Sequence, residues 1–244
     1  MQAYKKYILF FILVVCCQIL GWGQKSKYKH NPEYDDKPLH FGYTMGLNVM
    51  DFTFGRNYNG LNENYYADQL GLGLGFQVGM ISDLRLGEYF NLRCLPSFNF
   101  GQRTLQYFSG KSVYKVDTKM QEVKLESSML DLPILIKYKA MRLNNTRPYF
   151  IAGGSVRYDL ASKSKFDDKH PYVLLKPLDF YLEMGFGVDF YLEYFKFSTE
   201  IKLSLGLTDI LNHKTNENIK ENAVYVNSIR KLNSNILMIS FHFE

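Results

Sequence analysis

The first residues with the spacing of a binding site are three glycines in the segment LGLGLGF, which spans residues 70–76. Gly71, Gly73 and Gly75 could cradle a phosphate if a helix followed them, because the first amide groups of a helix point at a bound anion. No helical pattern follows this segment, and none follows the similar segment GFGVDF at residues 185–190. Neither segment therefore predicts a nucleotide site, and no cofactor is expected.

Histidine, serine and acidic residues form a second candidate group, because a histidine within reach of a serine and a carboxylate can activate a nucleophile. His170 and His213 fall in expected loops. These loops are rich in lysine, and neither histidine falls at the end of an expected strand. We therefore interpret the two histidines and the neighbouring polar residues as solvated. We expect no catalytic residue and no enzyme activity. The polar residues near His170 are Ser162, Ser164, Asp167 and Asp168.

Metal ligands are a third possibility. His40 and His242 fall near the ends of expected strands, where the two rings could form a pair. No third ligand type clusters with them, so we favour a hydrated rim and expect no metal site. The three cysteines contain no Cys-x-x-Cys spacing, which removes the common thiolate zinc sites as well.

The elements that carry these residues are strands, because apolar residues alternate with polar or small ones over long segments. In residues 70–80 the even positions are apolar, and the odd positions are glycine except for Gln77. A period of two produces a strand with two chemically different faces. The pattern recurs in eight segments, near residues 41–49, 70–80, 90–103, 130–138, 150–158, 178–192, 197–207 and 237–243.

The connections between these strands alternate in length. Long loops at one end, tight turns at the other and aromatic residues near strand ends are typical of outer-membrane barrels. A soluble β-sandwich is the alternative, since its strands alternate too. We predict an all-β fold, an eight-stranded antiparallel up-and-down transmembrane β-barrel of the outer-membrane type, located in the cell outer membrane. The long connections are residues 55–69, 106–122, 161–177 and 208–234, and the short ones lie near residues 83–89, 141–147 and 193–196.

Charged residues of both signs fall on the polar face of the expected strands, which would be the inner face of the barrel. They could line a channel, but eight strands enclose a space only wide enough for side chains. We therefore interpret them as a structural charge network in the lumen, in which opposite charges pair. Its members are Arg93, Arg103, Asp131, Lys137, Arg157, Glu183, Asp189, Glu200 and Lys202.

Two of the short connections predict specific neighbours within this network. The one between the fourth and fifth strands would place Asp131 directly opposite Arg157. The one between the sixth and seventh would place Asp189 beside Glu200, and Lys202 on the diagonal would offset their repulsion. The alternating glycines of residues 70–76 would leave room inside the barrel for such long side chains.

The first 23 residues are typical of an export signal, with Lys5 and Lys6 before an apolar stretch at residues 7–20. An uncleaved helical anchor is the alternative, but the stretch is short for a bilayer and Gln18 interrupts it. We predict a signal peptide at residues 1–23, a periplasmic N-terminal arm at residues 24–39 that hangs free, and the barrel at residues 40–244.

The charge balance bears on possible partners. The leader holds two of the 29 basic residues and none of the 24 acidic ones, so its removal lowers the formal net charge from +5 to +3. Such a small excess gives no reason to expect binding to nucleic acid.

Several segments resemble the PorT family, outer-membrane β-barrel proteins of the type IX secretion and gliding machinery in the Bacteroidetes. The wider likeness to Bacteroidetes outer-membrane barrels is carried by LDLPILIKYK at residues 130–139 and RPYFIAGGS at residues 147–155. The specific likeness to PorT rests on EYDDKP at residues 33–38, SDLRLGEYFNLR at residues 82–93 and DFYLEYFKFSTE at residues 189–200.

The resemblance implies a non-enzymatic component needed for the export of cargo proteins across the outer membrane, and it carries over no catalytic residue. The implied partners are outer-membrane lipid and other type IX secretion subunits, with no small-molecule substrate. A barrel filled by side chains cannot pass a folded cargo protein, so the chain would assist or stabilise the secretion apparatus rather than form its pore. An outer-membrane lipid-modifying enzyme and a generic structural or adhesion barrel are the alternatives.

Overall fold

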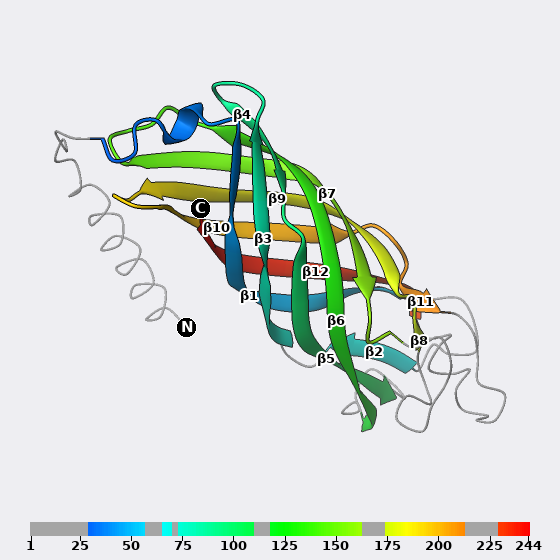
Figure 1. The fold of residues 1–244 in the computed structure, drawn as a ribbon. Helices are drawn as coiled ribbons and strands as arrows, with labels where there is room; N and C mark the ends of the chain where they lie inside the picture. Colours follow the sequence, from blue (N-terminus) through cyan, green and yellow to red (C-terminus); the bar gives the residue numbers. More distant parts are fainter. Residues whose placement is uncertain (1–28, 57–64, 70–72, 110–117, 163–173, 213–228) are drawn as a thin grey trace, which may run out of the picture.

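The computed structural model describes residues 29–56, 65–69, 73–109, 118–162, 174–212 and 229–244. Gly71, His170, His213 and the predicted signal peptide lie outside these residues. The long strands stand side by side around a common axis (Figure 1). The elements are η1 (Tyr34–Asp36), β1 (Leu39–Arg56), β2 (Tyr65–Gln69), β3 (Gly73–Arg85), β4 (Phe90–Cys94), β5 (Ser97–Ser109), β6 (Thr118–Lys139), β7 (Thr146–Asp159), β8 (Leu174–Leu175), β9 (Leu178–Tyr191), β10 (Lys196–Gly206), β11 (Leu211–Asn212) and β12 (Ile229–Phe243).

Antiparallel ladders close the described strands into a ring. β1 pairs with β3 on one side and with β12 on the other, and β10, β9, β7 and β6 follow β12 in that order. β4 and β5 together occupy the position between β6 and β3. Pro96, which has no amide hydrogen to donate, lies where these two strands divide. The ring thus has eight positions, and a closed ring satisfies its backbone groups internally, as a bilayer requires.

Side-chain exposure separates the two faces of the strands. On β3 the side chains of Leu74 and Phe76 are 74% and 52% exposed, whereas the side chain of Gln77 is 5% exposed. On β6 Ile134 is exposed while Lys137 is fully buried. Large apolar side chains therefore face outward and charged ones face inward, which is the reverse of a soluble protein. The predicted eight-stranded membrane barrel is confirmed, and the sandwich alternative is wrong.

The outward apolar surface has the height of a bilayer. On β1 the exposed apolar positions run from Leu39 to Leu47, Val49 is half-buried, and exposed polar side chains begin at Asp51 and Thr53. At about 3.3 Å per residue and the usual strand tilt, this stretch spans about 20 Å along the barrel axis. Outer-membrane barrels have an apolar band of about 25 Å, so the band on β1 is close to the expected height.

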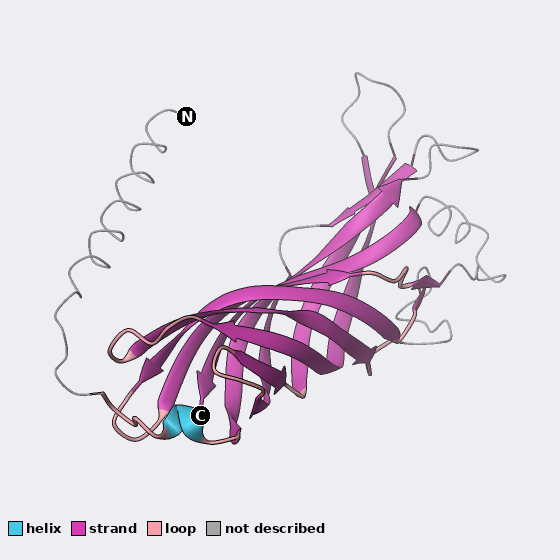
Figure 2. Ribbon diagram, turned by 90° about the horizontal axis from the view of Figure 1, so that it is seen from above, coloured by secondary structure: helices cyan, strands magenta, loops and turns pink. Residues whose placement is uncertain are grey.

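The two ends of the barrel differ in length and connection. Short turns at residues 86–89, 140–145 and 192–195 lie at the same end as residues 29–38 and Glu244 (Figure 2). We call this the turn end and the opposite end the loop end. At the loop end β5 and the 22-residue β6 extend past the ring, and β2 pairs with β5 there (Figure 1). The alternation of short and long connections predicted from the sequence is confirmed. Within the described residues, no helix is long and apolar enough to cross a membrane.

Gly73 provides a test of the packing inside the barrel. A Cβ atom at this position would lie 2.4 Å from the carbonyl oxygen of Gln102 and 3.0 Å from Cγ of Arg103. We expect Gly73→Leu to reduce barrel assembly strongly, because the obstructing oxygen belongs to a neighbouring strand. The measurement is the fraction of protein that migrates as a folded barrel in gels of unheated samples.

Gly87 supplies the matched control for this experiment. It lies in a short turn, and no atom lies within 4 Å of a Cβ atom placed there. Gly87→Leu should therefore fold like the unchanged protein. A normal folded fraction for Gly73→Leu would show that the interior tolerates bulk at this position.

Candidate functional site: a charge-filled barrel interior

The interior is the part of the molecule in which chemistry-bearing side chains gather. All nine residues of the predicted lumen network lie there, on six different strands, and each is at most 3% exposed. Their inward direction follows from the period of two, since each occupies an inward position of its strand. They are Arg93 on β4, Arg103 on β5, Asp131 and Lys137 on β6, Arg157 on β7, Glu183 and Asp189 on β9, and Glu200 and Lys202 on β10.

An ion-pair cluster that joins four strands lies in the middle of the barrel. Arg157 is directly opposite Asp131 in the ladder between β6 and β7, and its Nε lies 3.0 Å from Asp131 Oδ2. The same guanidinium pairs with Glu183 through Nη2, and Lys202 Nζ lies 2.8 Å from the other Glu183 oxygen. The predicted pairing of Asp131 with Arg157 is confirmed. Two cations and two carboxylates thus neutralise one another where water is excluded.

A second cluster surrounds Arg93 nearer the turn end. Its guanidinium contacts Asp83 at 2.8 Å, Glu200 at 3.2 Å and Glu244 at 3.3 Å. Burial raises the pKa of the Glu244 carboxyl, but Lys196 and Arg93 outweigh burial and hold that pKa below its usual value. Lys196 Nζ lies 2.7 Å from Glu244 Oε2. Glu244 is therefore a carboxylate that joins two buried cations.

Asp83, Lys196 and Glu244 belong to this cluster but are absent from the network predicted by sequence. Each lies one to three positions beyond the end of an expected strand, where the alternating pattern was too short to assign a face. Extending the period of two by these few positions assigns Asp83 and Lys196 to the inner face.

The predicted neighbours of Asp189 are wrong. Asp189 is opposite Ser198, and Glu200 is opposite Gly187, because the turn at residues 192–195 joins Tyr191 directly to Lys196 in the ladder. The register therefore differs by two residues from the expected one. A shift of two keeps every side chain on the same face, so Asp189 still points inward. Its partner is Lys137 on β6, whose Nζ lies 2.7 Å from Asp189 Oδ2.

The two strand-end histidines do not lie at a hydrated rim, which corrects that expectation. His242 is 1% exposed, and its Nε2 lies 3.3 Å from Glu200 Oε2. His40 is 8% exposed, stacks on Tyr34 and has its Nε2 2.7 Å from the Tyr34 carbonyl oxygen. Among the described residues, no group of three or more His, Cys, Asp or Glu side chains is placed to hold a metal ion.

The arm closes the turn end. Tyr34 in η1 stacks on His40 with ring centroids 4.3 Å apart, and its hydroxyl donates to Glu244 Oε2 at 3.3 Å. Burial raises the pKa of the Tyr34 hydroxyl above its usual value, so the group remains a donor. Asp35 accepts a hydrogen bond from the Tyr191 hydroxyl at 2.8 Å and pairs with Arg147 at 3.1 Å. The expectation of a free arm is therefore wrong for residues 29–38, which lie across the barrel end (Figure 2).

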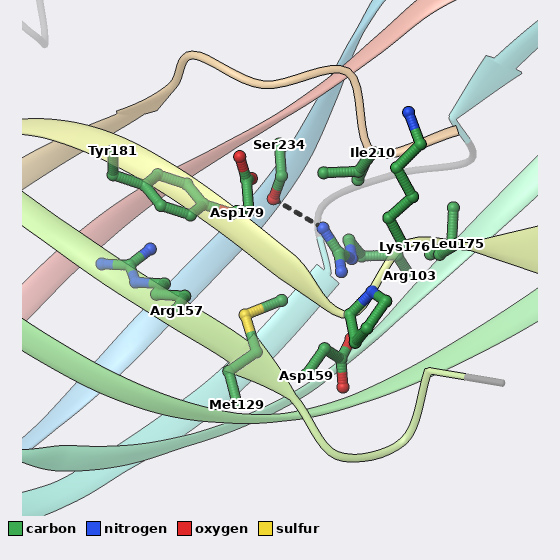
Figure 3. A pocket seen from close by; sticks show the side chains of 11 residues that line it. Arg103, Met129, Arg157, Asp159, Leu175, Lys176, Asp179, Tyr181, Ile210 and Ser234 are labelled. Carbon is green, nitrogen blue, oxygen red and sulfur yellow. Dashed lines mark hydrogen bonds between the residues drawn. The ribbon is translucent and has the colours of Figure 1, made fainter. Parts of the chain in front are cut away.

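An apolar cluster closes the loop end. The short strands β8 and β11 pair with each other and bring their buried leucines over the ends of the longer strands. Below them, a cavity of about 20 Å³ has room for about one water molecule (Figure 3). Within the described residues the interior is thus filled along its length and covered at both ends. The cluster consists of Phe52, Leu105, Leu125, Leu175, Ile210, Leu211, Ile229 and Leu232.

The sequence also has measurable likeness to known proteins. Residues 22–212 match a family model described as outer membrane protein beta-barrel domain. No curated protein matches the chain. Three solved structures are similar to it at low identity. The outer membrane protein OprG from Pseudomonas aeruginosa is 13% identical, with 83% of this chain and 94% of that chain covered and a TM-score of 0.47. Neisserial surface protein A is 10% identical, with 84% of this chain and 98% of that chain covered and a TM-score of 0.44. The N-terminal beta-barrel domain of Pseudomonas aeruginosa OprF is 10% identical, with 82% of this chain and 97% of that chain covered and a TM-score of 0.31.

The Arg157 cluster generates a prediction about stability. Arg157→Gln leaves Asp131 and Glu183 buried without their shared cation, and losing one partner of a buried ion pair costs about 3–5 kcal/mol. We expect the free energy of unfolding in denaturant, measured with the protein in detergent micelles, to fall by that amount.

Arg85→Gln is the control, because Arg85 pairs at 3.2 Å with Asp36, whose side chain is 76% exposed. An exposed pair contributes at most about 1 kcal/mol. Equal losses for the two variants would refute the view that the interior cluster is a major part of the stability.

Proposed function

Because this chain belongs to the family of outer-membrane proteins with a β-barrel domain, we propose that it is a non-enzymatic component required for type IX protein secretion. In this role it assists or stabilises the translocation apparatus in the outer membrane. The proposal rests on the resemblance to PorT, combined with the place in the fold where the segments that carry the resemblance meet.

Those segments meet at the turn end. EYDDKP contains η1, SDLRLGEYFNLR spans the turn between β3 and β4, and DFYLEYFKFSTE spans the turn between β9 and β10. Asp36 of the first pairs with Arg85 of the second at 3.2 Å. Asp35 of the first accepts a hydrogen bond from Tyr191 of the third at 2.8 Å. This joining of the three PorT-like segments is the observation that carries the proposal.

The proposed surface consists of η1 and the three short turns, and we refer to it as the turn-end surface. In outer-membrane barrels the short turns face the periplasm. The turn-end surface would then be available to other secretion subunits, while the apolar band contacts outer-membrane lipid. We propose no nucleic acid partner and no small-molecule substrate.

The filled interior supports an assisting role instead of a pore. An eight-stranded barrel has room inside for side chains alone, and here the space is occupied by buried ion pairs and covered at both ends of the described structure. A protein cargo therefore has no path through the described barrel. Contacts with cargo or with other subunits must use the outer surface.

A deletion experiment tests the role itself. Removal of the chain should abolish the appearance of type IX cargo proteins in the culture medium and leave them inside the cell. Normal export from the deletion strain would refute the role and favour a generic structural or adhesion barrel.

Two substitutions test the turn-end surface. Asp35→Ala removes the carboxylate that binds Tyr191 and Arg147, so export should fall while the amount of folded barrel stays unchanged. Asp51→Ala is the matched control, because this exposed carboxylate lies on β1 beyond the apolar band, toward the loop end. A loss of export in both variants, or in neither, would remove the turn-end surface from the proposal.

A chemical measurement tests the alternative that the chain is a lipid-modifying enzyme. Its candidate residues are His170 and His213, which lie outside the described residues. Replacement of both by alanine should leave the mass spectrum of lipid A unchanged. A changed lipid A profile would support the enzyme in place of the secretion role.

A further inference from the structure

Large apolar side chains are exposed in the short turns of the turn-end surface. Tyr194 is 91% exposed and lies in the turn at residues 192–195. Met141 is 71% exposed and Leu143 is 67% exposed, and both lie in the turn at residues 140–145. Turns that face water alone are usually built from small or polar residues. Apolar side chains gathered at one end of the molecule therefore indicate a contact that covers them.

These side chains stand apart from the apolar band that contacts lipid. Lys139, the last residue of β6, occupies an inward position, and Met141 lies two positions after it. Met141 therefore does not continue the outward face of β6. Tyr194 follows Glu193 in its turn, past the last pair of β9 with β10. Both residues thus lie past the end of the barrel wall (Figure 2).

The exposed charges of these turns are acidic. Glu88 and Glu193 are exposed, and neither carboxylate has an ion-pair partner among the described residues. The arm adds two exposed cations and two exposed carboxylates, which balance in formal charge, at Lys29, Glu33, Asp36 and Lys37. The described turn end therefore presents an excess of negative charge beside its apolar side chains.

The docked arm engages the arginines of the turn end. Arg142 donates hydrogen bonds to two carbonyl oxygens of the arm, and its side chain is 9% exposed. Arg147 pairs with Asp35 at 3.1 Å, and Arg85 pairs with Asp36 at 3.2 Å. These guanidinium groups are directed at the arm, while the carboxylates of the turns remain accessible. Docking of the arm thus gives the turn end its acidic character.

An acidic surface with apolar side chains fits a protein partner better than a lipid surface. Segments that lie on a membrane carry Lys and Arg beside their apolar side chains, because bilayer surfaces are negatively charged. The exposed charges of the turns have the opposite sign. Basic side chains of a partner protein would complement Glu88 and Glu193, and exposed Tyr and Met side chains are common anchors of protein interfaces.

We propose that the turn-end surface binds a basic segment of a partner protein, whose apolar side chains cover Tyr194, Met141 and Leu143. The partner depends on the proposed function, in which other secretion subunits reach this surface from the periplasm. Release of the arm would expose Arg142 and Arg147 and repel the same basic segment. The docked arm is therefore part of the recognised surface, and a chain with a released arm is not recognised.

Photo-crosslinking in intact cells tests the partner. The photoreactive residue p-benzoylphenylalanine is placed at position 194 of the full chain, and at position 186 in a matched control, because Phe186 is exposed in the apolar band on β9. We expect position 194 to form an adduct with a protein segment of net positive charge, identified by mass spectrometry, and position 186 to form adducts with lipid. A lipid adduct at position 194, no adduct, or an adduct on a segment without excess positive charge would overturn the proposal.

Charge reversal tests the basis of the recognition. The double substitution Glu88→Lys and Glu193→Lys should lower the yield of the protein adduct at position 194 by about tenfold, because like charges across an interface repel. Glu126→Lys is the control and should keep the full yield, since Glu126 is an exposed carboxylate on β6 toward the loop end. Migration as a folded barrel in gels of unheated samples shows that each variant has assembled. An unchanged yield in the assembled double variant would overturn the proposal.

The crosslink and the export assay give independent answers. A basic protein segment captured at position 194, together with normal export from the deletion strain, would support the binding surface and refute the secretion role. Loss of export from the deletion strain, together with lipid adducts alone at position 194, would keep the secretion role and overturn the basic partner.

Discussion

The narrow interior of an eight-position ring is the constraint on which the rest of the structure depends. Lipid on the outside requires apolar side chains there, so the polar half of every alternating strand must fit into one small space. Charges confined in this way have to neutralise one another, since water cannot solvate them. Arg157 with its two carboxylates and Arg93 with its three show the solution, in which each cation joins several strands.

Much of this architecture is readable from sequence because one physical rule governs it. The period of two in segments such as residues 178–192 fixes the strand and the direction of each side chain at once. The pairing of Asp131 with Arg157 follows from the same rule, since a short turn between neighbouring strands sets which residues are opposite. Local pattern and tertiary structure agree here, so the inner and outer faces could be assigned without coordinates.

The parts that sequence did not predict depend on contacts between distant segments. The turn is centred one residue earlier than expected, which changes the residue opposite Asp189 by two positions, and its ion-pair partner Lys137 lies on a different strand, β6. The arm at residues 29–38 is polar and contains proline, which is typical of a free segment. Its binding to the barrel depends on Arg147 and Tyr191, more than a hundred residues away in the chain. A local sequence pattern does not indicate which residues so far apart in the chain will be in contact.

The contact between Tyr34 and Glu244 has a consequence for the order of folding. The two residues are 210 positions apart, so their hydrogen bond closes the longest loop among the described side-chain contacts. The entropy of closing such a loop in an open chain is large, whereas a completed ring already holds β1 beside β12. We therefore expect the arm to reach Glu244 only after the ring has closed, so that a docked arm marks an assembled barrel.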